Sequence, residues 1–269
     1  MIKVATIAGS DASGGAGLEA DLKTFQEYGV YGMAAVTLVA TMDPLSDWSH
    51  SVFPLDEEVL RSQMETIFRG VGVEALKTGM LGTTYAVELA AQYISEFQIS
   101  KYVLDPVMVC KGAAEALQPE LNTLIAQKLL PLSLIVTPNL FEAGQLAGIE
   151  TPKTIDEMKE AARRIVSLGA KNVFIKGGSK LVGQTSAIDI FYDGTAFNQV
   201  ESALIDTKWT HGAGCTTAAA ITAGLAFGLD PYEAVSRAKK FITFSLRGSF
   251  DLNRWVGPGN PASWRKGFN

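Results

Sequence analysis

Short apolar runs alternate with longer amphipathic segments along most of the chain. The short runs are rich in aliphatic and β-branched residues, which is typical of buried strands. They cover residues 4–8, 33–40, 75–79, 102–105, 134–137, 172–176, 187–192 and 197–204. In the longer segments the apolar side chains recur with the period of an α-helix. These segments cover residues 18–28, 57–68, 85–97, 120–130, 140–147 and 157–168.

Two helix starts carry capping signals. Thr154 is followed at the third position by Glu157, which is the spacing of a capping box. Asp230 precedes Pro231, and Glu233 then places a negative charge in the first helical turn, where the helix dipole favours it. We therefore predict helices that begin after Thr154 and after Asp230.

The alternation of strands and helices predicts a mainly parallel sheet with helices on both of its faces. The pair Asp193-Gly194 is a hairpin signal, so the last strands are expected to be antiparallel. In folds of this kind, ligands bind beyond the carboxyl ends of the strands. The functional residues are therefore expected in the loops that follow the strands.

Composition narrows the class of protein. The chain has 269 residues, 47% of them hydrophobic, and a formal net charge of −5. This size suits one large α/β core, so a single domain over residues 1–269 is expected. The negative charge argues against nucleic acid or an anionic membrane as the main partner, and no apolar run approaches the roughly 20 residues of a spanning helix. With Cys110 and Cys215 as its two cysteines and no secretory signal, the chain is expected to carry free thiols in the cytoplasm.

Polar residues follow several of the predicted strands. Asp105 and Lys176 each end a strand, Asn139 and Glu142 follow another, and a glycine-rich segment at 9–17 follows the first. Each has a simpler alternative. Asn139 and Glu142 have the spacing of a helix cap, Lys176 could be a solvated charge, and the glycine loop could be a plain connector. That loop also lacks the spacing of a P-loop or of a dinucleotide-binding fingerprint.

The segment at 210–217 leads into a stretch of small residues that predicts a helix. Gly212 and Gly214 allow the backbone to turn tightly, so that several peptide N–H groups face one way at the helix start and favour an anion. Cys215 lies in the first turn, where the positive end of the helix dipole favours the thiolate. The alternative is a glycine-rich helix start that merely allows close packing, with Cys215 as an inert buried thiol.

Together these loops contain the groups that phosphoryl transfer requires. Glu142, with Asp105 as a second candidate, offers oxygen ligands for Mg²⁺, and Lys176 can reach the phosphates. Residues 212–215 offer N–H donors for the developing charge and, in Cys215, a base for the attacking hydroxyl group. The sequence therefore predicts a phosphotransferase site at the edge of the sheet.

A set of motifs extends over the chain from residue 3 to residue 258. They are Gly9-Ser10-Asp11, Gly14-Gly15-Ala16-Gly17, Ala20-Asp21-Leu22-Lys23-Thr24, Lys77-Thr78-Gly79-Met80-Leu81, Asp105-Pro106-Val107-Met108, Thr137-Pro138-Asn139-Leu140-Phe141-Glu142-Ala143, Lys176-Gly177-Gly178 and His211-Gly212-Ala213-Gly214-Cys215. This set resembles the ribokinase-like vitamin kinases, in the branch of the hydroxymethylpyrimidine kinases and the bacterial pyridoxine/pyridoxal kinases related to them. The resemblance implies a three-layer ribokinase-like α/β fold, ATP and Mg²⁺ as cofactors, and a homodimer.

The resemblance also implies roles for individual residues. It places the nucleotide at Asn139, Lys176, Gly177, Gly178, Ser179, Lys180, Asp189, Gly214 and Lys239. It places Mg²⁺ at Glu142, beside which Asp105 is the second candidate ligand from the loop analysis above. Catalysis is expected at Cys215, Lys176, Gly212 and Gly214, and the substrate at Met80, Val107 and Cys110. Many relatives in the wider superfamily have an aspartate base where this chain has Cys215, whereas its own branch typically has cysteine.

Two positions bear on the substrate. Met42 stands where the pyrimidine kinases usually carry a glutamine that binds the aminopyrimidine, and a thioether cannot donate that hydrogen bond. Cys110 stands where they usually carry alanine. In similar dual-cysteine pyridoxal kinases this cysteine adds to the aldehyde of pyridoxal, and Lys111 would favour its thiolate. The alternative for Cys110 is a small residue that fills a loop. The pattern favours ATP-dependent phosphorylation of the 5′-hydroxymethyl group of pyridoxal, pyridoxine or pyridoxamine.

Three other functions stay open on the sequence. The first is a hydroxymethylpyrimidine/phosphomethylpyrimidine kinase of thiamine biosynthesis, and the second is a nucleotide-binding regulator without turnover. The third is an acyl transferase that uses Cys215 and His211, which is the least favoured because no third residue is evident to orient the imidazole. A histidine that often follows the tail motif in the relatives is missing after Pro258. His50 is expected to pack in a loop after the second strand.

Overall fold

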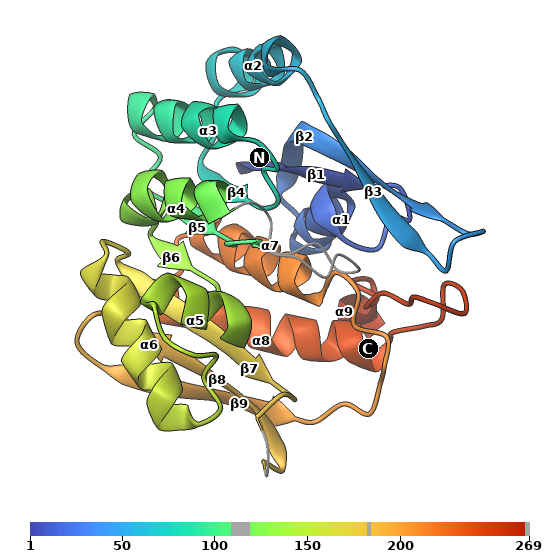
Figure 1. The fold of residues 1–269 in the computed structure, drawn as a ribbon, viewed down its shortest axis with the longest axis vertical. Helices are drawn as coiled ribbons and strands as arrows, with labels where there is room; N and C mark the ends of the chain where they lie inside the picture. Colours follow the sequence, from blue (N-terminus) through green and yellow to red (C-terminus); the bar gives the residue numbers. More distant parts are fainter. Residues whose placement is uncertain (109–118, 182–183, 267–269) are drawn as a thin grey trace.

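The computed structural model describes residues 1–108, 119–181 and 184–266. The described residues form a nine-stranded sheet in the order β3-β2-β1-β4-β5-β6-β7-β8-β9 (Figure 1). The strands are β1 (Lys3–Asp11), β2 (Tyr31–Asp43), β3 (Ser49–Pro54), β4 (Ala75–Thr78), β5 (Tyr102–Leu104), β6 (Ile135–Val136), β7 (Asn172–Gly178), β8 (Ser186–Tyr192) and β9 (Phe197–Ala203). Neighbours from β2 through β7 pair in parallel, and β8 and β9 add antiparallel strands at one edge. The predicted mainly parallel sheet with antiparallel last strands is confirmed.

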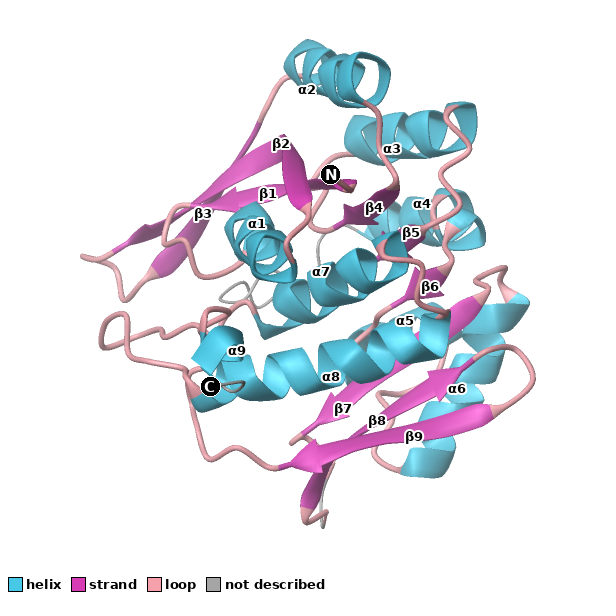
Figure 2. Ribbon diagram, turned by 180° about the vertical axis from the view of Figure 1, so that it is seen from behind, coloured by secondary structure: helices cyan, strands magenta, loops and turns pink. Residues whose placement is uncertain are grey.

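Helices cover both faces of this sheet (Figures 1 and 2). One face carries α1 (Gly17–Tyr28), α7 (Ala213–Ala226) and α8 (Pro231–Arg247), followed by the short α9 (Ser263–Lys266). The other carries α2 (Glu57–Glu65), which continues into a π-helical turn (Thr66–Val71), then α3 (Thr84–Glu96), α4 (Pro119–Lys128), a 3-10 turn (Leu130–Leu132), α5 (Leu140–Ala147) and α6 (Ile155–Ser167). Within the described ranges, no helix combines the length and apolar character that a membrane span requires.

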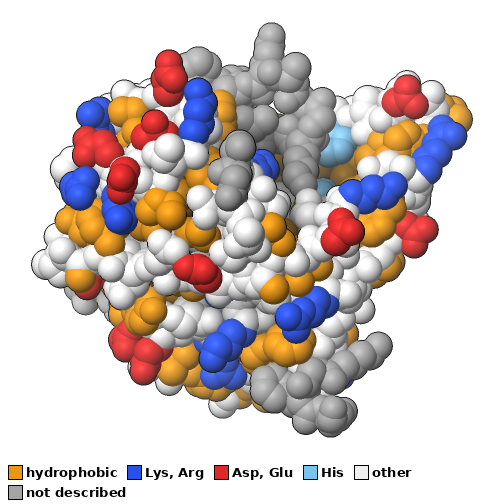
Figure 3. Space-filling model, turned by 90° about the horizontal axis from the view of Figure 1, so that it is seen from below, with side chains coloured by type: hydrophobic (Ala, Val, Ile, Leu, Met, Phe, Trp, Pro, Cys, Tyr) orange, Lys and Arg blue, Asp and Glu red, His pale blue; other side chains and the backbone are white. Residues whose placement is uncertain are grey.

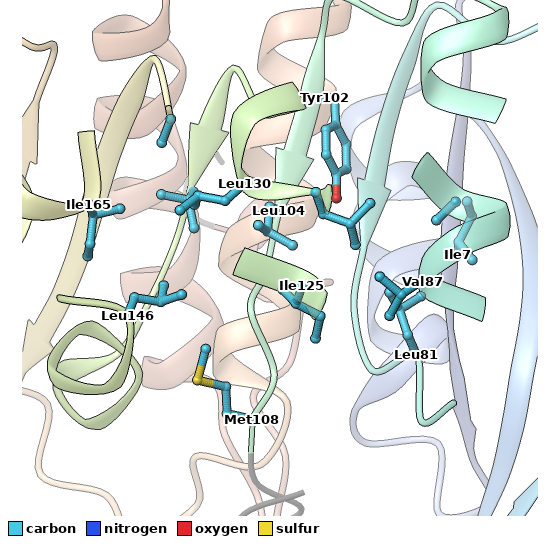
Figure 4. Close-up of a cluster of buried hydrophobic side chains, with 14 of the residues drawn as sticks. Ile7, Leu81, Val87, Tyr102, Leu104, Met108, Ile125, Leu130, Leu146 and Ile165 are labelled. Carbon is cyan, nitrogen blue, oxygen red and sulfur yellow. The ribbon is translucent and has the colours of Figure 1, made fainter. Parts of the chain in front are cut away.

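The two faces are built by alternate residues of the same strands. Val4 of β1 and Val103 of β5 lie in the apolar cluster under α1, α7 and α8, whereas Ala5 and Leu104 lie in the cluster on the opposite face. Successive side chains of a strand point to opposite faces, so a strand that is buried on both sides is apolar throughout. Figure 4 shows Leu104 among side chains of α4, α5 and α6, namely Ile125, Leu146 and Ile165.

The predicted helix caps are present. The Thr154 side chain accepts from the Glu157 amide at 3.2 Å, and Asp230 accepts from the Glu233 amide at 2.9 Å. In both cases the glutamate side chain returns a hydrogen bond to the backbone of the capping residue. Local chemistry therefore sets where α6 and α8 begin.

The first edge of the sheet differs from the sequence prediction. The residues after the second strand were expected to form a loop, but they form the strand β3. β3 pairs antiparallel with β2, which is longer than predicted, and this pairing places His50 opposite Met42. Most residues of β3 are exposed. An edge strand that buries neither face carries no apolar run, so its sequence gave no strand signal.

Candidate active site

A cleft of about 460 Å³ lies at the carboxyl ends of the parallel strands. It is lined by the predicted site residues Met80, Asp105, Val107, Asn139, Glu142, Lys176, Gly177, Gly178, Ser179, Lys180, Asp189, Gly212, Gly214, Cys215 and Lys239. Figure 3 shows this side of the molecule, with histidine side chains inside a hollow. Cys110 and Lys111 lie outside the described residues. The fold therefore brings every described candidate residue into one cavity.

Lys176 and Asp105 form an ion pair in the middle of the cleft. The Lys176 Nζ lies 3.1 Å from an Asp105 carboxylate oxygen, and 16% of the lysine side chain is exposed. The lysine is held by β7, whose backbone amide at this residue donates to the Pro138 carbonyl at 2.9 Å. Although burial opposes the charge, Asp105 raises the pKa of Lys176. A fixed cation therefore faces the cavity, which removes the solvated-charge alternative.

Glu142 is both a helix cap and a cleft residue. Its carboxylate accepts from the Asn139 amide at 2.8 Å, and the Asn139 side chain accepts from the Glu142 amide at 3.0 Å. The alternative of a capping pair is thus confirmed, but it does not remove the carboxylate from the cavity. Burial raises the pKa of Glu142 to about 7 against the attraction of Lys176, and the nearby charge of Asp105 adds to the increase. A bound cation would relieve this repulsion between two carboxylates.

A second ion pair lines the same cleft. The Lys239 Nζ of α8 lies 2.7 Å from an Asp189 oxygen of β8. The other Asp189 oxygen accepts from the Gly178 amide at 2.9 Å. This pair therefore fixes the loop after β7, which contains Ser179 and Lys180, against α8.

The turn before Cys215 has the expected geometry at Gly212, whereas Gly214 lies inside α7 and has no positive φ. Gly212 has a φ of 73° and precedes the first residue of α7. A Cβ atom at Gly212 would lie 1.9 Å from the Gly15 carbonyl oxygen, so no other residue fits without displacing the backbone. The amides of Gly214 and Cys215 belong to the first helical turn, where they have no acceptor within the helix. This end of α7 is therefore suited to an anion.

The predicted protonation state of Cys215 is wrong. The helix dipole was expected to lower the pKa of the thiol, but burial raises it to about 11. The charge of Lys77 and the Gly17 amide favour the thiolate, whereas Asp21 and Asp105 oppose it. Cys215 is partly buried in the wall of the cleft, and the loss of hydration at its sulfur outweighs the helix dipole.

The raised pKa predicts how Cys215 reacts. In a Cys110→Ser variant, Cys215 is the remaining cysteine. Because the thiolate is the reactive form, its rate of alkylation by iodoacetamide should increase about tenfold per pH unit from pH 7 to pH 10. Mass spectrometry would give this rate, with glutathione as a control that levels off near its own pKa. A rate that is already constant at pH 8 would contradict a thiol with a raised pKa.

Two charged residues that the sequence analysis did not single out lie beneath the cleft. The Lys77 Nζ lies 2.8 Å from Asp21, and neither side chain has any exposed surface. The Thr6 hydroxyl donates to the same carboxylate at 2.7 Å. Lys77 also lies 4.0 Å from Asp105. A lysine in the middle of an apolar strand was the signal that could have revealed this pair.

A second contact that the sequence analysis missed joins two segments that lie 200 residues apart in the chain. The His211 Nε2 lies 2.6 Å from an Asp11 oxygen. Asp11 is the last residue of β1, so its proximity to the turn before α7 depends on the tertiary structure. Asp11 is thus a partner for the His211 imidazole that the sequence analysis did not reveal. Met42 and His50 also line the cleft, on the wall formed by β2 and β3.

The layers, the strand order and the position of this cleft define the ribokinase-like α/β kinases as the class of this protein. The chain belongs to the phosphomethylpyrimidine kinase family, whose sequence model matches residues 11–260. The resemblance that the motifs indicated is thereby confirmed.

Its relatives within this family are similar over their whole length. A putative pyridoxine kinase of Treponema pallidum is 56% identical over 100% of both chains. The crystal structure of an ADP complex of Bacillus subtilis pyridoxal kinase has a TM-score of 0.95 at 53% identity, and the match covers 98% of this chain and 99% of that one. Staphylococcus aureus pyridoxal kinase in complex with AMP-PCP and pyridoxal has a TM-score of 0.93 at 44% identity, with 99% and 95% covered. A hydroxymethylpyrimidine/phosphomethylpyrimidine kinase of Bacillus subtilis is less similar, at 39% identity over 99% and 97% of the two chains.

Proposed function

We propose that this protein transfers the γ-phosphoryl group of ATP to the 5′-hydroxymethyl group of pyridoxal, pyridoxine or pyridoxamine. The observation that carries the proposal is the convergence of Glu142, Lys176 and Cys215 on one cleft. Phosphoryl transfer needs metal ligands, a cation and a base at a single point, and these side chains supply them. The names and ligands of the pyridoxine and pyridoxal kinases reported above support this choice of substrate.

The nucleotide is assigned to the part of the cleft that holds both ion pairs. Lys176 neutralises phosphate charge, and the amides of Gly212 to Cys215 hold the transferring group. Asn139, Gly177, Gly178, Ser179, Lys180, Asp189 and Lys239 line the same region and complete the nucleotide site. Because Asp105 already holds Lys176 in place, its ammonium group loses little conformational freedom on binding.

Glu142 and Asp105 are the residues that would hold Mg²⁺. Among the described residues, no group of three or more His, Cys, Asp or Glu side chains is arranged to hold a metal. Mg²⁺ commonly takes one or two carboxylates together with water and substrate phosphates, so two acidic residues fit it. When bound, the ion would neutralise charge on the phosphates. Its charge would also favour the ionised form of Glu142.

Cys215 is proposed to accept the proton of the attacking hydroxyl group at its Sγ. The sulfur is largely protonated at neutral pH because its pKa is about 11. The small fraction of thiolate is correspondingly a strong base, and the Lys77 ammonium and the Gly17 amide stabilise it. The mechanism thus uses a partly buried sulfur whose charge is balanced by Lys77 of β4 and by the Gly17 amide at the start of α1.

A substrate panel tests the function. The release of ADP would be measured with pyridoxal, pyridoxine, pyridoxamine and hydroxymethylpyrimidine at equal concentrations. We expect kcat/KM to be highest for a B6 vitamer, since Met42 lines the cleft and cannot form the hydrogen bond that an aminopyrimidine requires. Preference for hydroxymethylpyrimidine would favour the thiamine kinase, and no ADP release with any substrate would favour the nucleotide-binding regulator.

Cys110→Ala is expected to weaken the use of pyridoxal more than that of pyridoxine. A thiolate can add to the aldehyde of pyridoxal, whereas pyridoxine has an alcohol at that position. Comparing kcat/KM for the two vitamers would detect the difference, with Cys110→Ser as the variant that retains a polar atom. Equal losses for both substrates would indicate that Cys110 only fills space.

The domain organisation, oligomeric state and location of the enzyme are also part of the proposal. We infer that the chain acts as a single-domain kinase over residues 1–269, as a homodimer in the cytoplasm. All nine described strands belong to one continuous sheet, which supports a single domain. Sedimentation equilibrium at micromolar concentration would establish the mass, and a monomer that retains full activity would contradict the functional dimer.

A further inference from the structure

The glycine loop after β1 meets the turn before α7 at a buried hydrogen bond between two side chains. Asp11 and His211 are 200 residues apart in the sequence, yet an Asp11 oxygen lies 2.6 Å from the His211 Nε2. Only 6% of the Asp11 side chain and 10% of the His211 side chain are exposed. The His211 amide also donates to the Gly257 carbonyl at 3.1 Å. His211 is therefore held both at its imidazole ring and at its backbone amide.

The Asp11 carboxylate accepts hydrogen bonds from the backbone of the loop that follows it. One oxygen accepts from the Ser13 amide at 2.8 Å, and the other accepts from the Ala16 amide at 2.9 Å. Although burial acts against the charge, hydrogen bonds from His211 and Ser13 lower the pKa of Asp11 to about 2. The carboxylate is therefore ionised at neutral pH and fixes the path of the backbone up to the start of α1.

Gly17 is the first residue of α1 and lines the cleft together with Cys215. Its N–H favours the ionised form of the Cys215 thiol. Gly17 has a φ of 58°, and a Cβ atom there would lie 2.3 Å from the Gly9 carbonyl oxygen. Its position is thus set by the same backbone that Asp11 holds.

The two loops are in close contact beside the Asp11–His211 pair. A Cβ atom at Gly15 would lie 2.5 Å from the His211 ring, and one at Gly212 would lie 1.9 Å from the Gly15 oxygen. Such close approach leaves no room for the loops to slide past each other while the pair is intact. A break in the pair would instead let the Gly17 donor and the sulfur separate.

We propose that Asp11 and His211 are positioning residues, which lock the loop after β1 against the start of α7 so that the Gly17 amide faces the Cys215 sulfur. This inference rests on the proposed function, because it requires Cys215 to act in phosphoryl transfer. Neither residue needs to exchange a proton with the substrate. Their effect on the reaction passes through the sulfur.

A double-mutant cycle tests this connection. His211→Ala should lower kcat by about tenfold or more, since small displacements of reacting groups are costly, while KM for ATP stays within about twofold. In a Cys215→Ala background the same substitution should change kcat by less than about twofold, because the group that it positions is gone. His211→Gln, which retains a donor near the Nε2 position, should recover most of the loss.

Two controls make the outcome decisive. Arg164→Ala removes an exposed ion pair of α6 outside the cleft and should leave kcat unchanged. If thermal melting shows that His211→Ala does not fold, Asp11→Asn takes its place in the cycle. An unchanged kcat, an equal decrease in both backgrounds, or a loss explained by KM alone would overturn the positioning role. No turnover by the wild-type enzyme, or full activity of Cys215→Ala alone, would instead contradict the proposed function.

Discussion

Replacing Cys215 by alanine is expected to lower kcat by about 10²-fold or more with little change in ATP affinity. The sulfur lies at the first turn of α7, and in our proposal it is the group that accepts the hydroxyl proton. In the same proposal the nucleotide binds at other parts of the cleft, chiefly at Lys176 and the Asp189–Lys239 pair. Single-turnover kinetics and calorimetric titration with a non-hydrolysable ATP analogue would measure the two quantities separately.

Two further substitutions at this position distinguish a base from a space-filling residue. Cys215→Asp introduces another base and should retain more activity than Cys215→Ala. Cys215→Ser matches the size of cysteine but is a much weaker acid, so it should resemble the alanine variant. A kcat that is the same in all three variants as in the wild type would remove the sulfur from the mechanism.

Lys77→Met is expected to reduce the free energy of unfolding by about 3–5 kcal/mol, because it leaves the buried Asp21 carboxylate without its cation. Burial already raises the pKa of Asp21 despite the attraction of Lys77. The Thr6 hydroxyl would remain as a partner for Asp21, but it carries no charge. Urea denaturation followed by circular dichroism would measure the loss.

The double variant Lys77→Met/Asp21→Asn provides the matching test. It removes both charges and keeps an oxygen that can accept from Thr6, so most of the lost stability should return. Lys159→Met is a suitable control, since its partner Asp156 is 94% exposed and the pair is screened by water. If the double variant is as unstable as Lys77→Met alone, lost packing and not an unpaired charge is the cause.

Most of the fold could be predicted because its signals are local. The core strands are apolar throughout, since both of their faces are covered, and the capping pairs mark helix starts within a few residues. The edge strand β3 lacked such a signal, because its residues face water on most sides. The candidate residues of the cleft were also accessible to sequence analysis, since the carboxyl ends of parallel strands meet at one edge of the sheet.

The sequence by itself therefore determined the three-layer fold, the family and the side chains that gather at the cleft. Only the tertiary structure decided how those side chains interact. The pairs Lys77–Asp21 and Asp11–His211 join segments that are far apart along the chain. The pKa of Cys215 is raised and not lowered as the sequence predicted, because neighbouring groups remove water from the sulfur. Periodicity and motifs report local backbone preference, whereas burial and charge pairing depend on contacts that exist only once the chain has folded.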